Sequence, residues 1–276
     1  MNVNKALWEK GDFTVVAEAM RESGEALVAT LDIRRDMDVL DLGCGDGTTA
    51  VPIAKLGAEV LGIDIASNLV AAGNARAAAQ GLDNLRFQEG DASNLFDIAD
   101  DSFNLVVSIF GAMFAPQPFD VAREMMRVTR PGGRIVMGNW IPGDPTLVAQ
   151  VLKISAAYTP PPPEGFISPV TWGVADRVLE RFVAAGASKD AVTCEKTSYV
   201  FRHSGPPREF FERFRQFYGP TMNAFEAATS QGRADALADE LSTLFEEQNE
   251  GGLDLTIIPA SYLKVVVTKA ETHGAD

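Results

Sequence analysis

The feature that most constrains the fold of this chain is a glycine-rich segment at residues 39–47, which reads VLDLGCGDG. Its apolar start is typical of a buried strand, and three glycines follow at alternate positions, Gly43, Gly45 and Gly47. Glycine permits positive φ and lets a ligand approach the backbone. A helix expected from about Thr48 directs its N-terminal amides at that ligand. The segment therefore predicts a strand, a turn and a helix that bind a nucleotide-like molecule.

Short apolar runs alternate with helical stretches through the middle of the chain. Strands are expected at residues 37–42, 59–64, 85–90, 103–108 and 134–140, with helices at about 48–56, 67–80 and 118–129. Neighbouring parallel strands need a crossover connection, which these helices supply. We therefore expect a Rossmann-like α/β fold, with a mostly parallel seven-stranded sheet and helices on both faces.

The flanks of this core, residues 1–34 and 141–276, carry other patterns. Apolar residues at helical spacing predict an N-terminal helical arm within residues 1–34. Alternating runs at 191–203 and 256–269 predict the last strands, and two helical patterns between them predict a helical cap inserted before the last strand. A chain of 276 residues can bury its core as one domain, so we expect a single domain over 1–276, with the cofactor core at 35–140 and substrate-side elements after it.

A proline-dense stretch interrupts the pattern after the core. Residues 159–165 read TPPPPEG, and four consecutive prolines hold a polyproline-like segment. Two interpretations stay open, a stiff surface connector and a wall over the active site.

The charge and cysteine usage exclude several classes of partner. The formal net charge of -14 argues against nucleic acids and anionic membranes, which bind through clustered Lys and Arg. The longest apolar stretch, residues 105–116, is too short to span a bilayer. Cys44 and Cys194 are too few for a disulfide framework and lack the paired spacing of a zinc site. We expect a cytoplasmic protein without a metal.

Two acidic residues follow the next predicted strands and narrow the class of ligand. Asp64 lies 17 positions after Gly47, where a carboxylate can accept hydrogen bonds from both hydroxyls of an adenosyl ribose. Asp91 follows the third strand, where a carboxylate can accept a hydrogen bond from an exocyclic amine such as that of adenine. The third glycine of a dinucleotide site should fall at position 48, which is Thr48. This spacing disfavours the alternative of an NAD(P)-dependent oxidoreductase.

In combination these motifs resemble class I S-adenosylmethionine (SAM)-dependent methyltransferases, particularly the small-molecule branch that includes ubiquinone/menaquinone-type enzymes. The resemblance covers roughly residues 35–140. It rests on Asp41-x-Gly43-x-Gly45-x-Gly47, Asp64, Gly90-Asp91-Ala92, the FNLVVS strand and the turn from Arg127 to Gly133.

The resemblance implies a role for each matching residue. The turn from Gly43 through Cys44 to Gly47 holds the methionine part of SAM. For Asp41, which ends the strand before this turn, we favour a dual role, holding the turn and meeting the amino group of the cofactor through water; the alternative is that it only receives amides of the turn. Asp64, Ile65 and Asn68 lie at the ribose, and Gly90, Asp91 and Ala92 lie at the adenine. Ser108, Ile109 and Phe110 lie beside the sulfonium, and Lys5 and Trp8 of the N-terminal arm fold over the cofactor. The product is S-adenosylhomocysteine (SAH).

Aromatic residues near the predicted strand ends suggest where an acceptor binds. We expect pocket members among Phe114, Trp140 and Trp172, with Met113 and Tyr218 as further candidates, although core packing is the alternative for each.

His203 is a candidate general base, with a surface or hydrogen-bonded histidine as the alternative. His273, three residues from the C-terminus, is given no role.

Because SAM carries an activated methyl group, the protein mainly needs to align an acceptor, so the absence of a catalytic triad is uninformative. The expected function is methyl transfer to a small, largely apolar molecule. A noncatalytic SAM-binding protein is the second alternative, beside the oxidoreductase.

Overall fold

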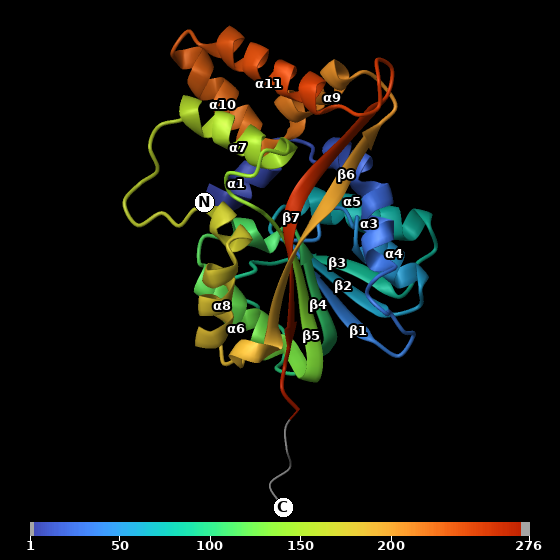
Figure 1. Ribbon diagram of the computed structural model, residues 1–276. Coiled ribbons are helices and arrows are strands. Elements are labelled where there is room, and N and C mark those ends of the chain that lie inside the picture. The colour runs from blue at the N-terminus through green and yellow to red at the C-terminus, as the bar shows by residue number, and fades with distance from the viewer. Residues whose placement is uncertain (1–2, 272–276) are drawn as a thin grey trace, which may run out of the picture.

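The computed structural model describes residues 3–271 and contains one seven-stranded sheet (Figure 1). The strand order is β3-β2-β1-β4-β5-β7-β6. The strands are β1 (Asp38–Leu42), β2 (Glu59–Asp64), β3 (Leu85–Glu89), β4 (Phe103–Ile109), β5 (Thr129–Trp140), β6 (Val192–His203) and β7 (Thr256–Thr268). β1 to β5 are parallel, whereas β7 runs antiparallel to both β5 and β6. The expected Rossmann-like sheet is confirmed.

Helices cover both faces of the sheet, as crossover connections require. In Figure 1, α6 and α8 lie on one side, while α3, α4 and α5 lie on the other. The helices are α1 (Val3–Glu9), α2 (Thr14–Ala17), α3 (Arg21–Val28), α4 (Ala50–Lys55), α5 (Ser67–Ala79), α6 (Pro118–Val128), α7 (Leu147–Tyr158), α8 (Ala175–Ala184), α9 (Pro207–Phe217), α10 (Gly219–Ser230) and α11 (Ala234–Gln248). Short 3-10 turns are η1 (Glu18–Met20), η2 (Ala112–Phe114), η3 (Pro169–Gly173) and η4 (Lys189–Ala191).

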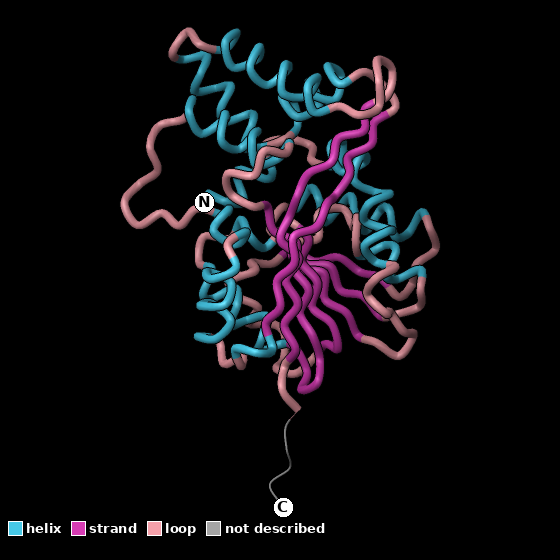
Figure 2. Tube along the Cα trace, in the orientation of Figure 1, coloured by secondary structure: helices cyan, strands magenta, loops and turns pink. Residues whose placement is uncertain are grey.

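A long antiparallel ribbon connects the sheet to the helical cap. β6 and β7 pair from Val192 opposite Val267 to His203 opposite Thr256, and Figure 2 shows this ribbon running past the ends of the other strands. The cap consists of α7, α9, α10 and α11, with the rings of Phe210, Phe214 and Phe245 packed together at its centre. The cap therefore lies above the carboxyl ends of the parallel strands.

Several helices depart from the sequence expectation. The arm expected as one helix is divided into α2, η1 and α3, and α7, α8 and α10 were not expected. Pro142 and Pro145 precede α7 and leave its interior free of proline, so they do not disturb the helix. α8 buries Val178 and Phe182 along one face. These helices are formed by packing against the sheet and the cap.

The proline segment is a surface connector. Residues 160–167 are exposed, and Figure 1 shows the chain between α7 and α8 projecting away from the body of the molecule. The wall interpretation is therefore not supported.

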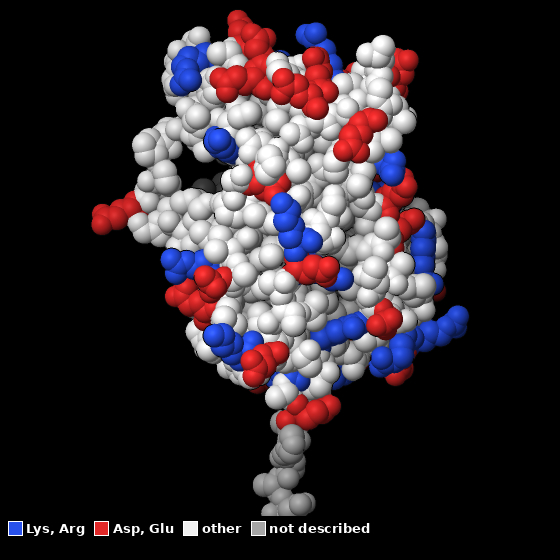
Figure 3. Space-filling model, viewed as in Figure 1, with Lys and Arg blue, Asp and Glu red and all other residues white. Residues whose placement is uncertain are grey.

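The outer surface of the cap is acidic. Figure 3 shows Asp and Glu side chains gathered along the top of the molecule, over α11. The acidic residues of this helix are Asp235, Asp239, Glu240, Glu246 and Glu247. Within residues 3–271, no helix combines the length and apolar character needed to cross a membrane.

Candidate functional site

A cavity lies at the carboxyl ends of β1, β2 and β4, where ligands bind in open parallel sheets. The space inside it and at its open mouth is about 910 Å³. We call it the loop cavity. It is lined by Asn4, Trp8, Phe13, Met20, Asp41, Leu42, Gly43, Cys44, Gly45, Asp46, Thr48, Thr49, Ile63, Asp64, Ile65, Leu69, Gly90, Asp91, Ala92, Ile109, Phe110, Gly111, Ala112, Ala115 and Tyr199.

The glycines of the turn have positive φ, 70° at Gly43, 55° at Gly45 and 88° at Gly47, but different surroundings. A Cβ added at Gly43 would lie 2.6 Å from the Cα of Gly111, and one at Gly47 would lie 2.7 Å from the ring of Phe87. A Cβ at Gly45 would meet no atom within 4 Å. Gly43 and Gly47 therefore allow close packing, whereas Gly45 presents bare backbone to open space.

Asp64 fixes the position of the turn. Its two carboxylate oxygens accept hydrogen bonds from the amides of Gly45 at 2.8 Å and Ala66 at 2.9 Å. The residue is only 8% exposed, and this burial raises the pKa of its carboxyl group. Asp64 thus joins the glycine turn to the start of α5 while lining the cavity.

Asp41 is the most deeply buried acid of the loop cavity. It is 2% exposed, and its Oδ2 has no hydrogen-bond partner within residues 3–271. Burial raises the pKa of Asp41 to about 8, and the nearby charge of Asp64 acts in the same direction. An unpartnered buried oxygen is costly, so this position favours a ligand that brings a hydrogen-bond donor.

The N-terminal region holds the glycine turn from above. Arg21 forms an ion pair with Asp46 and also donates to the hydroxyl of Thr48. At Gly24, an added Cβ would lie 2.8 Å from the carbonyl oxygen of Thr48. This close contact needs a residue without a side chain on α3.

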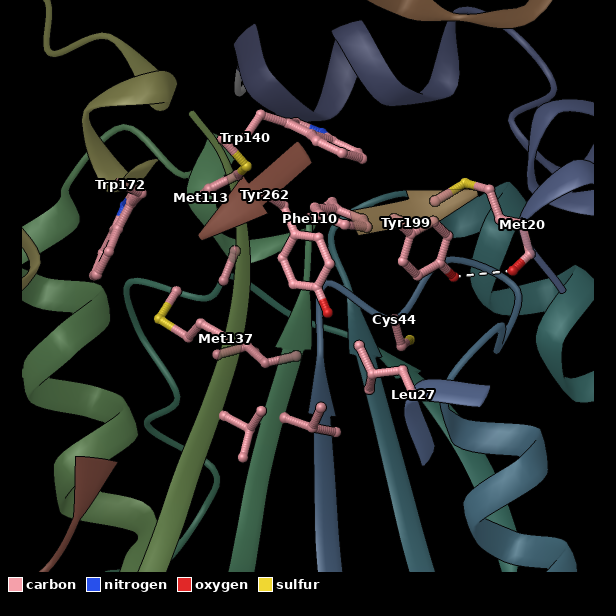
Figure 4. Packing of buried hydrophobic residues seen from close by; sticks show 14 of the residues in the cluster. Met20, Leu27, Cys44, Phe110, Met113, Met137, Trp140, Trp172, Tyr199 and Tyr262 are labelled. Atoms are coloured by element: carbon pink, nitrogen blue, oxygen red, sulfur yellow. Dashed lines mark hydrogen bonds between the residues drawn. The ribbon is translucent and has the colours of Figure 1, made fainter. Parts of the chain in front are cut away.

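Phe110 turns the chain after β4 and begins an aromatic cluster. Its φ of 62° is in the left-handed region, which is strained for a bulky residue. The ring stacks on Trp140 with centroids 3.6 Å apart, and the rings of Tyr199 and Tyr262 meet it edge-on (Figure 4). The hydroxyl of Tyr199 donates to the carbonyl oxygen of Met20 at 2.9 Å, as Figure 4 shows.

A second cavity adjoins the first, and we call it the aromatic cavity. Its space is about 330 Å³. It is lined by Trp8, Phe13, Val16, Met20, Phe110, Phe114, Trp140, Val148, Phe201, Phe214 and Tyr218. The two cavities share Trp8, Phe13, Met20 and Phe110. A molecule in one cavity therefore lies next to a molecule in the other.

Helix α1 spans the edge of both cavities. On the sheet side, Lys5 pairs with Glu89, and Glu9 accepts hydrogen bonds from the amide and hydroxyl of Ser67. On the cap side, Lys10 pairs with Glu226 at 2.6 Å. Trp8 lies between these contacts, 4.9 Å from the ring of Phe114.

Most residues expected at the cofactor line the loop cavity, but four do not. Gly47 packs against the ring of Phe87, and Asn68 donates to the carbonyl oxygen of Gly11 at 3.2 Å. Ser108 donates to the carbonyl oxygen of Leu42 at 2.6 Å and is buried. Lys5 forms the ion pair of α1. These four residues support the cavity wall from outside.

The acceptor candidates divide in the same way. Phe114, Trp140 and Tyr218 line the aromatic cavity. Met113 and Trp172 line neither cavity. Met113 is buried, and Trp172 is buried under the guanidinium of Arg181, 4.5 Å from the ring centroid. Both residues therefore pack in the core, which was the alternative interpretation.

His203 also lines neither cavity. It ends β6, stacks on Phe210 and lies 3.8 Å from Glu209, and burial lowers the pKa of its imidazole. The position of His203 therefore does not support a role as general base. His273 lies outside the described residues.

Sequence reasoning missed several lining residues. Phe13 and Met20 belong to an apolar pattern that was assigned to an ordinary helix, and Tyr199 lies on a strand far along the chain. Asp46 and Gly111 could have been found from the sequence, because Asp46 lies within the glycine-rich segment and Gly111 directly follows the expected site residue Phe110.

Several solved proteins share this fold. Phosphoethanolamine N-methyltransferase 2 of Haemonchus contortus, solved with SAH and phosphomonomethylethanolamine, has a TM-score of 0.62 at 17% identity, covering 98% of this chain and 61% of that chain. The YcgJ protein of Bacillus subtilis has a TM-score of 0.58 at 20% identity, covering 91% of this chain and 99% of its own. A family model described as a methyltransferase domain matches residues 39–133.

The chain carries this methyltransferase domain and is a SAM-dependent methyltransferase. It is 34% identical over 249 residues to the uncharacterized protein Rv1403c of Mycobacterium tuberculosis, covering 88% of this chain and 87% of that protein. Methyltransferase GfsG of Streptomyces halstedii is 36% identical over 141 residues, which is 50% of each chain.

Proposed function

We propose that this enzyme methylates a small, largely apolar molecule bound in the aromatic cavity, using SAM bound in the loop cavity. The observation that carries the proposal is the shared wall of Trp8, Phe13, Met20 and Phe110, because it brings a donor and an acceptor side by side. Bound SAM supplies a methyl group on a sulfonium, and its transfer leaves neutral SAH.

The residues of the loop cavity fit SAM chemically. The open backbone at Gly45 offers space for close approach, and the unpartnered Oδ2 of Asp41 suits the amino group of the methionine part. Asp64 and Ile65 would hold the ribose, and Asp91 with Gly90 and Ala92 would frame the adenine. Carboxylate oxygens accept more than one hydrogen bond, so Asp64 can keep its backbone partners while it binds the ribose hydroxyls.

The protein's part in the reaction is alignment and exclusion of water. Ile109 and Phe110 would line the methyl side, and the stack of Phe110 on Trp140 gives the acceptor a rigid wall. Positioning of two reactants is a large source of rate enhancement, so methyl transfer is compatible with an aromatic wall whose described residues include no Asp, Glu, His, Lys or Arg. An acceptor proton, where present, leaves to solvent or buffer after its heavy atom has bonded to the methyl carbon.

The experiment is a screen with SAM that carries a labelled methyl group, over phenols, quinols, carboxylates, amines and thiols. We expect label in an apolar product and formation of an equal amount of SAH. Label in none of the classes, despite SAM binding, would favour the noncatalytic alternative.

The proposal extends to the branch and the location of the enzyme. Demethylmenaquinone methyltransferase of Paenarthrobacter aurescens is 34% identical over 114 residues, 41% of this chain, which supports a small-molecule branch. Cys44 and Cys194 are both free thiols, as expected in the reducing cytoplasm.

A further inference from the structure

The aromatic cavity restricts the charge of whatever it binds. Its lining residues are aromatic or aliphatic, and among those described none is Asp, Glu, Lys, Arg or His. A negatively charged group placed there would lose its hydration without gaining an ion pair, which is strongly unfavourable. The bound molecule therefore carries no negative charge in the part that enters the cavity.

The walls of the cavity also restrict its shape. Phe110 and Trp140 are stacked, with an angle of 8° between their planes, and the rings of Trp8 and Phe114 meet edge-on at 4.9 Å. Aromatic rings prefer offset-stacked or edge-to-face partners, so a flat ring gains more from these walls than a flexible chain does.

One side chain of the cavity has a polar end without a partner. Tyr218 is 4% exposed, and its hydroxyl forms no hydrogen bond with another residue of the described range 3–271. Tyr218 also lines the aromatic cavity. Burial raises the pKa of Tyr218, so the hydroxyl keeps its proton and can donate it.

We propose that the acceptor is a flat ring compound without a negative charge that carries a hydrogen-bond-accepting oxygen or nitrogen, and that Tyr218 is the residue that recognises this atom. The inference rests on the proposed function, since it names the substrate class of the aromatic cavity. Tyr218 acts here in specificity, and it takes no part in the bond changes of methyl transfer.

The test measures binding of three matched probes to the full chain saturated with SAH, by calorimetry. Acetophenone has a ring and a ketone oxygen, ethylbenzene has the ring alone, and benzoate has the ring with a negative charge. We expect acetophenone to bind and benzoate to bind at least about tenfold more weakly. Tyr218→Phe should weaken acetophenone by about 2- to 12-fold, the range for one hydrogen bond, and ethylbenzene by less than twofold.

Tyr262→Phe is the matched control. Tyr262 is also buried and packs on Phe110 with centroids 5.3 Å apart, but it lines neither cavity, so its variant should bind all probes as the wild type does. Equal affinity for benzoate and acetophenone, no binding of acetophenone, or an equal effect of Tyr218→Phe on acetophenone and ethylbenzene would overturn the inference. Each result is separable from failure of the proposed function, which would appear as loss of SAH binding itself or of methyl transfer to every acceptor class.

Discussion

Two carboxylates of the loop cavity, Asp41 and Asp64, differ in what holds them. Asp64 accepts two backbone amides, from Gly45 and Ala66, so it has a structural partner at each oxygen. Asp41 has an oxygen without a partner, buried beside a cavity. The backbone amides therefore hold the Asp64 carboxylate in place before a ligand binds, whereas Asp41 gains a hydrogen-bond partner only when a ligand supplies one.

Replacing Asp64 should weaken SAM binding. We expect Asp64→Ala to cost about 1.5 to 3 kcal/mol of binding free energy, the range for hydrogen bonds to a charged group. Asp64→Asn, which keeps one oxygen for the amides, should cost less than Asp64→Ala. Calorimetry with SAM measures both, and the exposed Asp97→Ala is the control. Unchanged affinity in a folded Asp64→Ala protein would refute the ribose assignment.

The raised pKa of Asp41 predicts a pH-dependent stability. The folded pKa of about 8 lies above the ordinary 3.8, so the folded state holds a proton that the unfolded chain releases. The contribution to stability is fully present below pH 3.8 and is lost as the pH rises through about 8. Without ligand, Asp41→Asn should therefore gain melting temperature relative to the wild type between pH 5 and pH 9. A constant difference between the two melting curves across that range would contradict the shift.

At the scale of elements, the N-terminal segments connect the sheet to the cap. α1 is joined to β3 through Lys5 and to the start of α5 through Glu9, and Lys10, directly after α1, pairs with the cap. α3 lies against the glycine turn at Gly24. Both cavities therefore depend on a segment that lies outside the region covered by the family motifs.

Truncation of Trp8 should affect donor and acceptor together, because its ring lines both cavities. We expect Trp8→Ala to weaken SAM binding by about 0.5 to 1.5 kcal/mol, the size of one aromatic contact, and to raise KM for the acceptor. Phe96→Ala is the control, since Phe96 is 78% exposed. Wild-type values for both constants would show that α1 does not contribute to either cavity.

A side chain at Gly24 should disturb the glycine turn. Gly24→Val would place a Cβ 2.7 Å from Cγ2 of Thr48 and 2.8 Å from its carbonyl oxygen. Overpacking of this kind costs about 1 to 3 kcal/mol, which a denaturant titration measures. Ala26→Val, at an exposed position of the same helix, separates the contact from helix propensity. Equal losses in the two variants would remove the contact as the cause.

For the whole molecule, cofactor binding and stability are linked. SAH at 100 times its Kd should raise the free energy of unfolding by about 2.7 kcal/mol, since a ligand of the folded state stabilises by mass action. NAD at the same concentration should leave the melting temperature unchanged. Stabilisation by NAD without stabilisation by SAH would contradict the assignment of SAM as the cofactor.

Local signals were sufficient for the cofactor half of the fold. The glycine spacing around Gly45, the acids Asp41, Asp64 and Asp91, and the alternation of apolar runs all lie within short stretches of chain, where each strand leads directly into its ligand-binding turn. Such signals are readable because backbone geometry near a turn depends on nearby residues. Trp172 shows the limit of the same reasoning, since an aromatic residue near a strand end can pack on an arginine instead of facing a ligand.

The sequence by itself determined the sheet, the glycine turn and the methyl donor. The tertiary structure alone decided the proposed acceptor site, because the wall of the aromatic cavity combines Trp8 and Phe13 from the N-terminal region, Phe110 after β4, Trp140 from β5, and Tyr218 from the cap. Burial of apolar surface is non-directional, and the pattern of a helix or strand does not state which distant element will cover it. Only the folded chain shows that these five rings line one cavity beside the loop cavity.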